Sequence, residues 1–113
     1  MKNILLVILL FLLCGCSKNK LTCNYETMYE DIEIKNKIVF NFEEETYKQI
    51  DKMIFEDSIS ASKYYDEIEE YKDEYNLVLQ DNIIISEIVD EIKLDGDKED
   101  IKEQYESYDY KCK

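Results

Sequence analysis

The sequence predicts an α+β fold: an antiparallel sheet with two helices packed on one face, preceded by an N-terminal signal helix. Three features of the 113-residue chain support this prediction. Apolar and polar residues alternate in its first half, apolar residues recur at helical spacing in two later segments, and an unbroken apolar run opens the chain. The elements follow the order βββ-α-ββ-α, which is typical of a two-layer sandwich of sheet and helices.

The first fifteen residues have the layout of an export signal. Lys2 supplies one positive charge, and residues 4–13 form a run of ten apolar side chains. A helix needs roughly 20 apolar residues to span a bilayer, so this run has the length of a signal-peptide core. We therefore predict that residues 1–15 are a signal peptide that is removed.

The signal ends in Leu13-Cys14-Gly15-Cys16, which resembles the bacterial lipobox, a Leu followed by small residues and then Cys. The resemblance implies that the Cys16 thiol carries a diacylglyceryl group. It also implies cleavage between Gly15 and Cys16, which makes Cys16 the first residue of the mature chain. The alternative is an ordinary signal peptide that contains cysteines. Cys14 is the poorer acceptor of lipid, because the bulky Leu13 precedes it.

A lipidated Cys16 would place the mature protein on the outer face of the cell membrane. Two acyl chains anchor a protein stably, whereas one chain holds it only marginally. Residues 16–20 would be the lipid-anchored tether, and the four residues after Cys16 reach at most roughly 14 Å. Lys18 and Lys20 favour anionic lipid. The mature chain as a whole is acidic, with 13 Lys against 27 Asp and Glu, and we expect its remaining part to be repelled.

Residues 21–113 are expected to form a single domain, because no Pro-rich or Ser/Gly-rich linker divides them. Alternation with period two predicts strands over 21–29 and 32–42. Residues 46–56 fit either a helix or a strand. We favour a third antiparallel strand, because Met53-Ile54-Phe55 is rich in strand-forming side chains.

The second half is expected to hold two helices and a hairpin. A first helix follows a cap at Ser58 or Ser60 and ends at Asn76. The hairpin comprises residues 77–79, a turn at Asp81-Asn82 and a strand over 83–92, although Ile84, Ile88 and Ile92 also fit a helical stripe. The last helix is capped by Asp97. Its predicted buried stripe consists of Ile101, Tyr105 and Tyr108.

Cys23 and Cys112 are the two cysteines left after cleavage and lipidation. An even pair in an exported protein predicts a disulfide, here closing a loop of 90 residues counted inclusively. Two free thiols or a redox pair are the alternatives. A redox pair usually takes the form C-x-x-C, which is absent.

The layout as a whole resembles small bacterial lipoproteins of the YehR-like kind. The resemblance rests on the lipobox followed closely by Leu21-Thr22-Cys23, on alternating strands, on a helix containing Tyr64-Tyr65, and on the ending Tyr110-Lys111-Cys112-Lys113. It covers the whole mature chain. It implies an α+β lipoprotein domain, and it implies no activity and no catalytic residues.

Composition disfavours several classes of function. The net charge of −13 argues against nucleic-acid binding, because phosphate backbones require Lys and Arg. The chain has no His, which is the commonest general base and metal ligand. Residues 95–100 resemble part of a calcium loop, but Asp100 stands where that loop requires Gly, so we interpret them as a turn and a helix cap.

We therefore expect a non-enzymatic, membrane-anchored extracytoplasmic lipoprotein with a binding or envelope-structural role. The alternative is an accessory ligand- or cation-binding lipoprotein associated with a transporter, and an enzyme of unfamiliar type is a third hypothesis. The predicted partner is the membrane, through the lipid on Cys16. No cofactor, metal site or catalytic residue is predicted, and the protein or small-ligand partner stays open.

Overall fold

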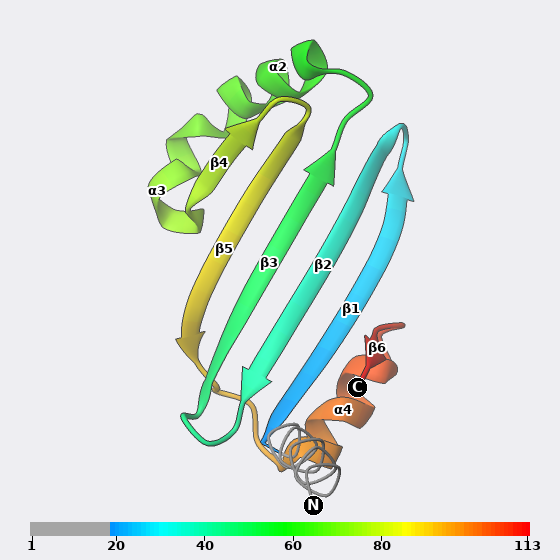
Figure 1. Ribbon diagram of the computed structural model, residues 1–113, viewed down its shortest axis with the longest axis vertical. Coiled ribbons are helices and arrows are strands. Elements are labelled where there is room, and N and C mark those ends of the chain that lie inside the picture. Colours follow the sequence, from blue (N-terminus) through cyan, green and yellow to red (C-terminus); the bar gives the residue numbers. More distant parts are fainter. Residues whose placement is uncertain (1–18) are drawn as a thin grey trace, which may run out of the picture.

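The computed structural model describes residues 19–113, which form a six-stranded antiparallel sheet with helices packed on one of its faces (Figure 1). The predicted signal helix, Gly15 and Cys16 lie outside these residues. The strands are β1 (Lys20–Tyr29), β2 (Ile32–Asn41), β3 (Thr46–Ile54), β4 (Leu77–Gln80), β5 (Ile83–Glu91) and β6 (Lys111–Cys112). The helical segments are α2 (Ser58–Ile68), the 3-10 turn η1 (Glu69–Tyr71), α3 (Lys72–Tyr75) and α4 (Lys98–Glu106).

The strands lie in the order β4-β5-β3-β2-β1-β6, and every neighbouring pair is antiparallel. The α+β prediction is confirmed, and so are its five strands. The ambiguous segment 46–56 is a strand because it pairs on both sides, with β2 and with β5. β1 begins at Lys20, one residue before the expected start of the domain, and the backbone N–H of Phe42 donates to the Asn19 carbonyl at 2.8 Å.

The core divides into two groups of buried side chains. The first group joins α4 to β1 and β2 and comprises Leu21, Cys23, Ile38, Phe40 and Ile101. The second group joins α2 to β5 and to the end of β3, and comprises Phe55, Ala61 and Ile84. In the strand register, Leu21 faces Phe40, and Met53, which packs against the second group, faces Ile84. Side chains alternate along each strand, so both groups lie on one face of the sheet.

The two helical regions cover opposite ends of that face. In Figure 1, α2 and α3 lie at the β4–β5 side of the sheet, whereas α4 lies beside β1 and β6. The ring of Tyr105 on α4 meets the Phe40 ring edge-on at 5.4 Å between centroids, as the predicted stripe requires. Tyr108 does not belong to this stripe. It follows the end of α4 and is 59% exposed, so its predicted burial was wrong.

The first helix differs from the prediction at its start and in its second half. Its N-cap is Asp57 rather than Ser58 or Ser60, because the Asp57 carboxylate accepts the Ser60 backbone N–H at 2.7 Å. This bond lowers the pKa of Asp57. The helix then passes through η1 into α3, which shifts the helical phase and leaves Tyr71 and Tyr75 exposed. Asn76 ends the segment as predicted, with φ 51°.

The turn before α4 confirms the interpretation of residues 95–100 as a turn and cap. Asp97 and Asp100 form a capping box, in which each side chain accepts the other's backbone N–H at 3.0 Å. Gly96 has φ 110°, and a Cβ there would lie 2.6 Å from the Asp100 Cβ. The turn therefore requires Gly at this position.

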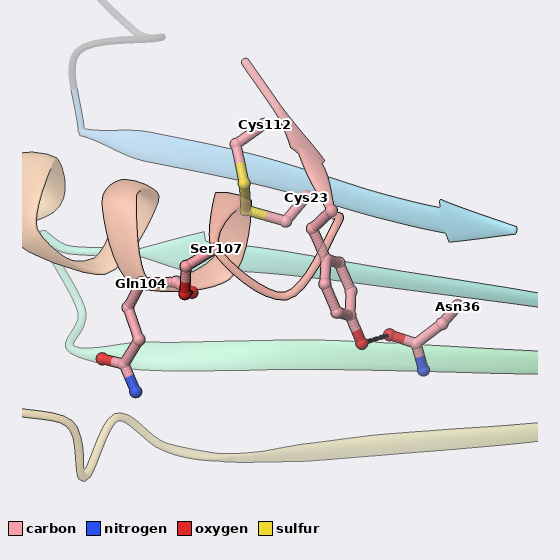
Figure 2. The surroundings of a disulfide bond; sticks show 6 residues. Cys23, Asn36, Gln104, Ser107 and Cys112 are labelled. Carbon is pink, nitrogen blue, oxygen red and sulfur yellow. Dashed lines mark hydrogen bonds between the residues drawn. A yellow bond between two sulfur atoms is a disulfide. The ribbon is translucent and has the colours of Figure 1, made fainter.

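The C-terminal strand β6 was not predicted, because two residues are too few for a periodic pattern. Thr22 and Lys113 exchange both backbone hydrogen bonds, at 3.0 and 2.9 Å. The next pair, Cys23 and Cys112, is therefore a non-hydrogen-bonded pair, in which side chains approach most closely. Their Cα atoms are 4.0 Å apart and a disulfide joins them, as predicted (Figure 2).

Loss of the disulfide is expected to destabilise the domain without unfolding the sheet. Cys23 and Cys112 are 89 positions apart, so the bond removes much chain entropy from the unfolded state. We expect the Cys23→Ser/Cys112→Ser variant to lose about 2–5 kcal/mol of unfolding free energy, measured by denaturant titration. Reductant should lower the stability of the original protein to the same level and leave the double variant unchanged. An equal effect of reductant on both proteins would contradict the prediction.

Candidate anion-binding face

One face of the sheet carries no helix among residues 19–113. We call it the open face, and it consists of the strand residues that alternate with the core. Three rows of cross-strand neighbours run across it. The rows are Thr22–Val39–Lys48–Val89, Asn24–Lys37–Ile50–Glu87 and Glu26–Lys35–Lys52–Ile85. The alternation that buries Leu21 and Phe40 on one side therefore places lysines on the other.

The open face is positively charged, although the protein as a whole is acidic. Its lysines are Lys20, Lys35, Lys37, Lys48, Lys52 and Lys111, and its acidic residues are Glu26, Glu33, Glu87 and Glu91. The helical layer has the opposite balance. Residues 57–76 hold seven Asp and Glu against two Lys, and residues 97–106 hold five against two. The two faces of the sheet are thus oppositely charged.

A hollow of about 250 Å³ lies in the middle of the open face. Lys35, Lys37 and Lys52 line it, and the rest of its lining comes from Asn24, Tyr25, Glu26, Asn36 and Ile50. The three lysines come from the central strands β2 and β3, which are paired on both sides. Because these strands cannot fray from an edge, the sheet holds the stems of the lysines at a fixed spacing.

Two of these lysines are direct cross-strand neighbours. Lys35 faces Lys52, and like charges at such positions are unfavourable. The Lys35 Nζ lies 3.6 Å from Glu33 Oε1 and 3.8 Å from Glu26 Oε1, which partly neutralises it. Among the residues described, no carboxylate lies within 4.0 Å of the Nζ of Lys37 or Lys52. The hollow therefore holds positive charge that these contacts leave unbalanced.

This arrangement is suited to binding an anion. Ammonium groups on flexible stems act as point charges toward phosphate or carboxylate. The apolar side chain of Ile50 and the stems of the lysines add apolar area to the lining of the hollow. The hollow contains no Ser, Cys or His beside a base that would make it a nucleophilic site.

The helix-covered face has a polar row between its two core groups. The Asn36 side-chain amide donates to Asp51 Oδ1, and the Gln49 amide donates to Asp51 Oδ2 at 3.0 Å. The Tyr110 hydroxyl donates to Asn36 Oδ1 at 2.5 Å, drawn as the dashed line in Figure 2. Within residues 19–113, no buried side-chain N or O atom lacks a partner. The row therefore ties the segment after α4 to the central strands.

Burial raises the pKa of Asp51, and the hydrogen bond from Gln49 opposes this shift. The carboxyl group is half-buried in the middle of the row. A raised pKa in the folded state means that the folded protein prefers the protonated form. Asp51 therefore destabilises the fold when it is charged, and the hydrogen bonds of its neighbours compensate in part.

The predicted site residues have different outcomes. Cys23 and Cys112 are brought together in a disulfide. The cleavage and lipidation residues, Gly15 and Cys16, lie outside the described residues, so those expectations stay predictions. The lysine face was missed because charge was considered for the mature chain as a whole. Its signal was the position of Lys35 and Lys37 on the polar phase of the second strand, and of Lys48 and Lys52 two places either side of Ile50 in the third.

Removing one lysine of the cross-strand pair is expected to stabilise the domain. Lys52→Gln ends the repulsion with Lys35, and we expect a gain of about 0.2–1 kcal/mol in unfolding free energy at low salt. The matched control is Lys37→Gln, because Lys37 faces the uncharged Asn24 and Ile50. Denaturant titration should show a gain for Lys52→Gln alone, which disappears at high salt. A similar gain for both variants would attribute the effect to the positive charge of the open face as a whole rather than to the Lys35–Lys52 pair.

The Asp51→Asn variant is expected to change how stability depends on pH. Folding raises the pKa of Asp51 above its ordinary value of 3.8. The contribution of Asp51 to the free energy of unfolding is therefore most favourable below pH 3.8, and it is lost as the pH rises through the folded-state pKa. Asn does not titrate, so the variant should not lose stability over this pH range for this reason. Relative to the variant, the original protein should therefore be more stable at about pH 3 than at about pH 7. Denaturation at the two pH values measures this, and a constant difference would contradict it.

Among residues 19–113, the structure has no helix with the length and apolar character that a membrane span needs. The same residues contain no group of three or more Cys, Asp or Glu side chains arranged to hold a metal ion. No protein-family model, curated protein or solved structure matches the chain.

Proposed function

We propose that the protein is a membrane-anchored extracytoplasmic bacterial lipoprotein with a non-enzymatic binding or envelope-structural role. The observation that carries the proposal is the position of Cys16. It ends a lipobox-like signal, and β1 begins only four residues later, at Lys20. A diacylglyceryl group on Cys16 would hold the folded domain close to the lipid surface.

Two properties of the folded domain support an extracytoplasmic location. The Cys23–Cys112 disulfide is of the kind that persists in oxidising compartments and is rare in the cytosol. The same bond fixes the C-terminal strand β6 beside β1, directly after the proposed anchor. Both ends of the domain are thereby held, which suits a small module exposed to proteases.

A binding or structural role agrees with the kind of surface that the domain presents. The distinctive feature of the described residues is the positively charged open face with its lysine-lined hollow. The likeness in layout to YehR-like lipoproteins agrees with this role and adds no activity.

The alternative function is that of an accessory ligand-binding lipoprotein beside a transporter. The charge of the hollow limits which ligand such a protein would bind. The hollow is lined by Lys35, Lys37 and Lys52, which would repel a cation and attract an anion. If the protein delivers a small ligand, the lysines of the hollow favour an anion over the cation that the sequence-based alternative names.

Substituting the two cysteines of the signal separately tests the anchor. We expect Cys16→Ser to abolish both lipid attachment and cleavage, because the hydroxyl cannot replace the thiolate as nucleophile. Cys14→Ser is the matched control and should be processed normally. Mass spectrometry of membrane-bound protein should find Cys16 as the modified N-terminal residue in the original protein and in the control. An unmodified Cys16 in protein released to the medium would overturn the proposal.

A further inference from the structure

We propose that the open face lies flat on the anionic phospholipid headgroups of the membrane that holds the protein. This inference rests on the proposed lipid anchor, and it adds the orientation of the domain and the chemistry of its contact. The surface of contact would be the lysine-bearing side of β1, β2 and β3, with the helices turned away from the bilayer. It assigns a role to the unbalanced charge of Lys37 and Lys52.

The short tether limits which surfaces can reach the lipid. From Cys16 to Lys20 the chain extends at most about 14 Å, whereas the ten-residue strand β1 is about 34 Å long. The domain must therefore rest on a surface that includes the start of β1. Lys20 belongs to the open face and lies at this end of the strand. A flat arrangement on the open face satisfies the tether.

Charge separates this arrangement from the two others that the tether allows. If the domain stood on its end, the turn Glu43-Glu44-Glu45 would face the headgroups, because that turn follows Asn41, the neighbour of Lys20. If it lay on its helices, the acidic residues around α4 would face them. Both arrangements bring carboxylates against phosphates. The open face has six lysines to four glutamates.

The net negative charge of the protein does not prevent this contact. At physiological ionic strength, charges further than about 8–10 Å from the lipid are largely screened. The acidic helical layer lies on the far side of the sheet and is separated from the headgroups by it. The charges that lie next to the lipid are those of the open face, and they determine the orientation.

The hollow supplies a specific contact within this face. A phosphate placed between Lys35 and Lys52 would offset the repulsion between these cross-strand neighbours. Ile50, which lines the hollow, and the exposed Val89 in an adjoining row offer apolar area to the glycerol region of the lipid. Anionic lipid should thus be preferred over a zwitterionic one, in which the choline group compensates the phosphate.

Chemical labelling of lysine amines in the lipidated mature protein, residues 16–113, tests the orientation. The protein is reconstituted into vesicles of phosphatidylcholine alone or of phosphatidylcholine mixed with phosphatidylglycerol. Acetylation rates of individual lysines are then measured by mass spectrometry. We expect Lys37, Lys52 and Lys111 to react about three- to tenfold more slowly in the anionic vesicles, and the protection to fade at high salt. Lys63 and Lys72 on the helical layer are internal controls and should react equally in both.

Two double variants, each lacking two lysines, compare the two faces at the same change in net charge. Lys37→Gln/Lys52→Gln removes two lysines from the open face, and Lys63→Gln/Lys72→Gln removes two from the helical layer. The first variant should lose protection at the remaining Lys111, whereas the second should retain it. Loss in both, or in neither, would contradict an orientation set by the open face.

Failure of this inference can be distinguished from failure of the anchor. Flotation with pure phosphatidylcholine vesicles, together with the mass of the Cys16 peptide, reports the anchor alone. An anchored protein whose lysines are labelled equally in both vesicles overturns the orientation and leaves the anchor intact. Protection seen on whole cells but absent from both kinds of vesicle also overturns it, and would assign the open face to another anionic component of the envelope.

Discussion

The alternation of side chains along β1, β2 and β3 is the constraint on which the rest of the structure depends. A residue on these strands faces either the helices or the open side, and no position serves both. The residues that build the core around Phe40 therefore determine, by register, where Lys35, Lys37 and Lys52 lie. A shift of the register by one residue would bury the lysines and expose the core, so folding and the charge of the open face are specified together.

On the helix-covered side, the side chains selected by this alternation form one core at each end of the sheet. One core lies under α4 and the other under α2, and the polar row around Asp51 occupies the interval between them. Neither core is large, so covalent closure of the chain ends adds to the cohesion of the first one. Cys23 is itself a fully buried member of that core, which means that the disulfide joins β6 to the packed interior rather than to the surface.

Much of this fold could be predicted from the sequence, because the period-two alternation over the ten residues of β1 and the ten of β2 leaves little ambiguity. The strand at 46–54 was ambiguous by periodicity and is decided by its two neighbours in the sheet, which are tertiary contacts. The first helix was predicted as continuous because spacing of apolar residues does not reveal the change of phase at η1. β6 has only two residues and owes its strand conformation to β1 and to the disulfide. The lysine face was visible as a pattern, but its charge balance requires knowing which strands are neighbours.

The closed loop between Cys23 and Cys112 also changes what a single break in the backbone would do. Nearly every strand and helix of the domain lies between these two positions. A cut in any exposed turn of this interval, such as the one following β2, would leave two fragments still joined through sulfur. Both pieces would stay attached to whatever holds the N-terminal end of β1, so nicked molecules would remain in place instead of being shed.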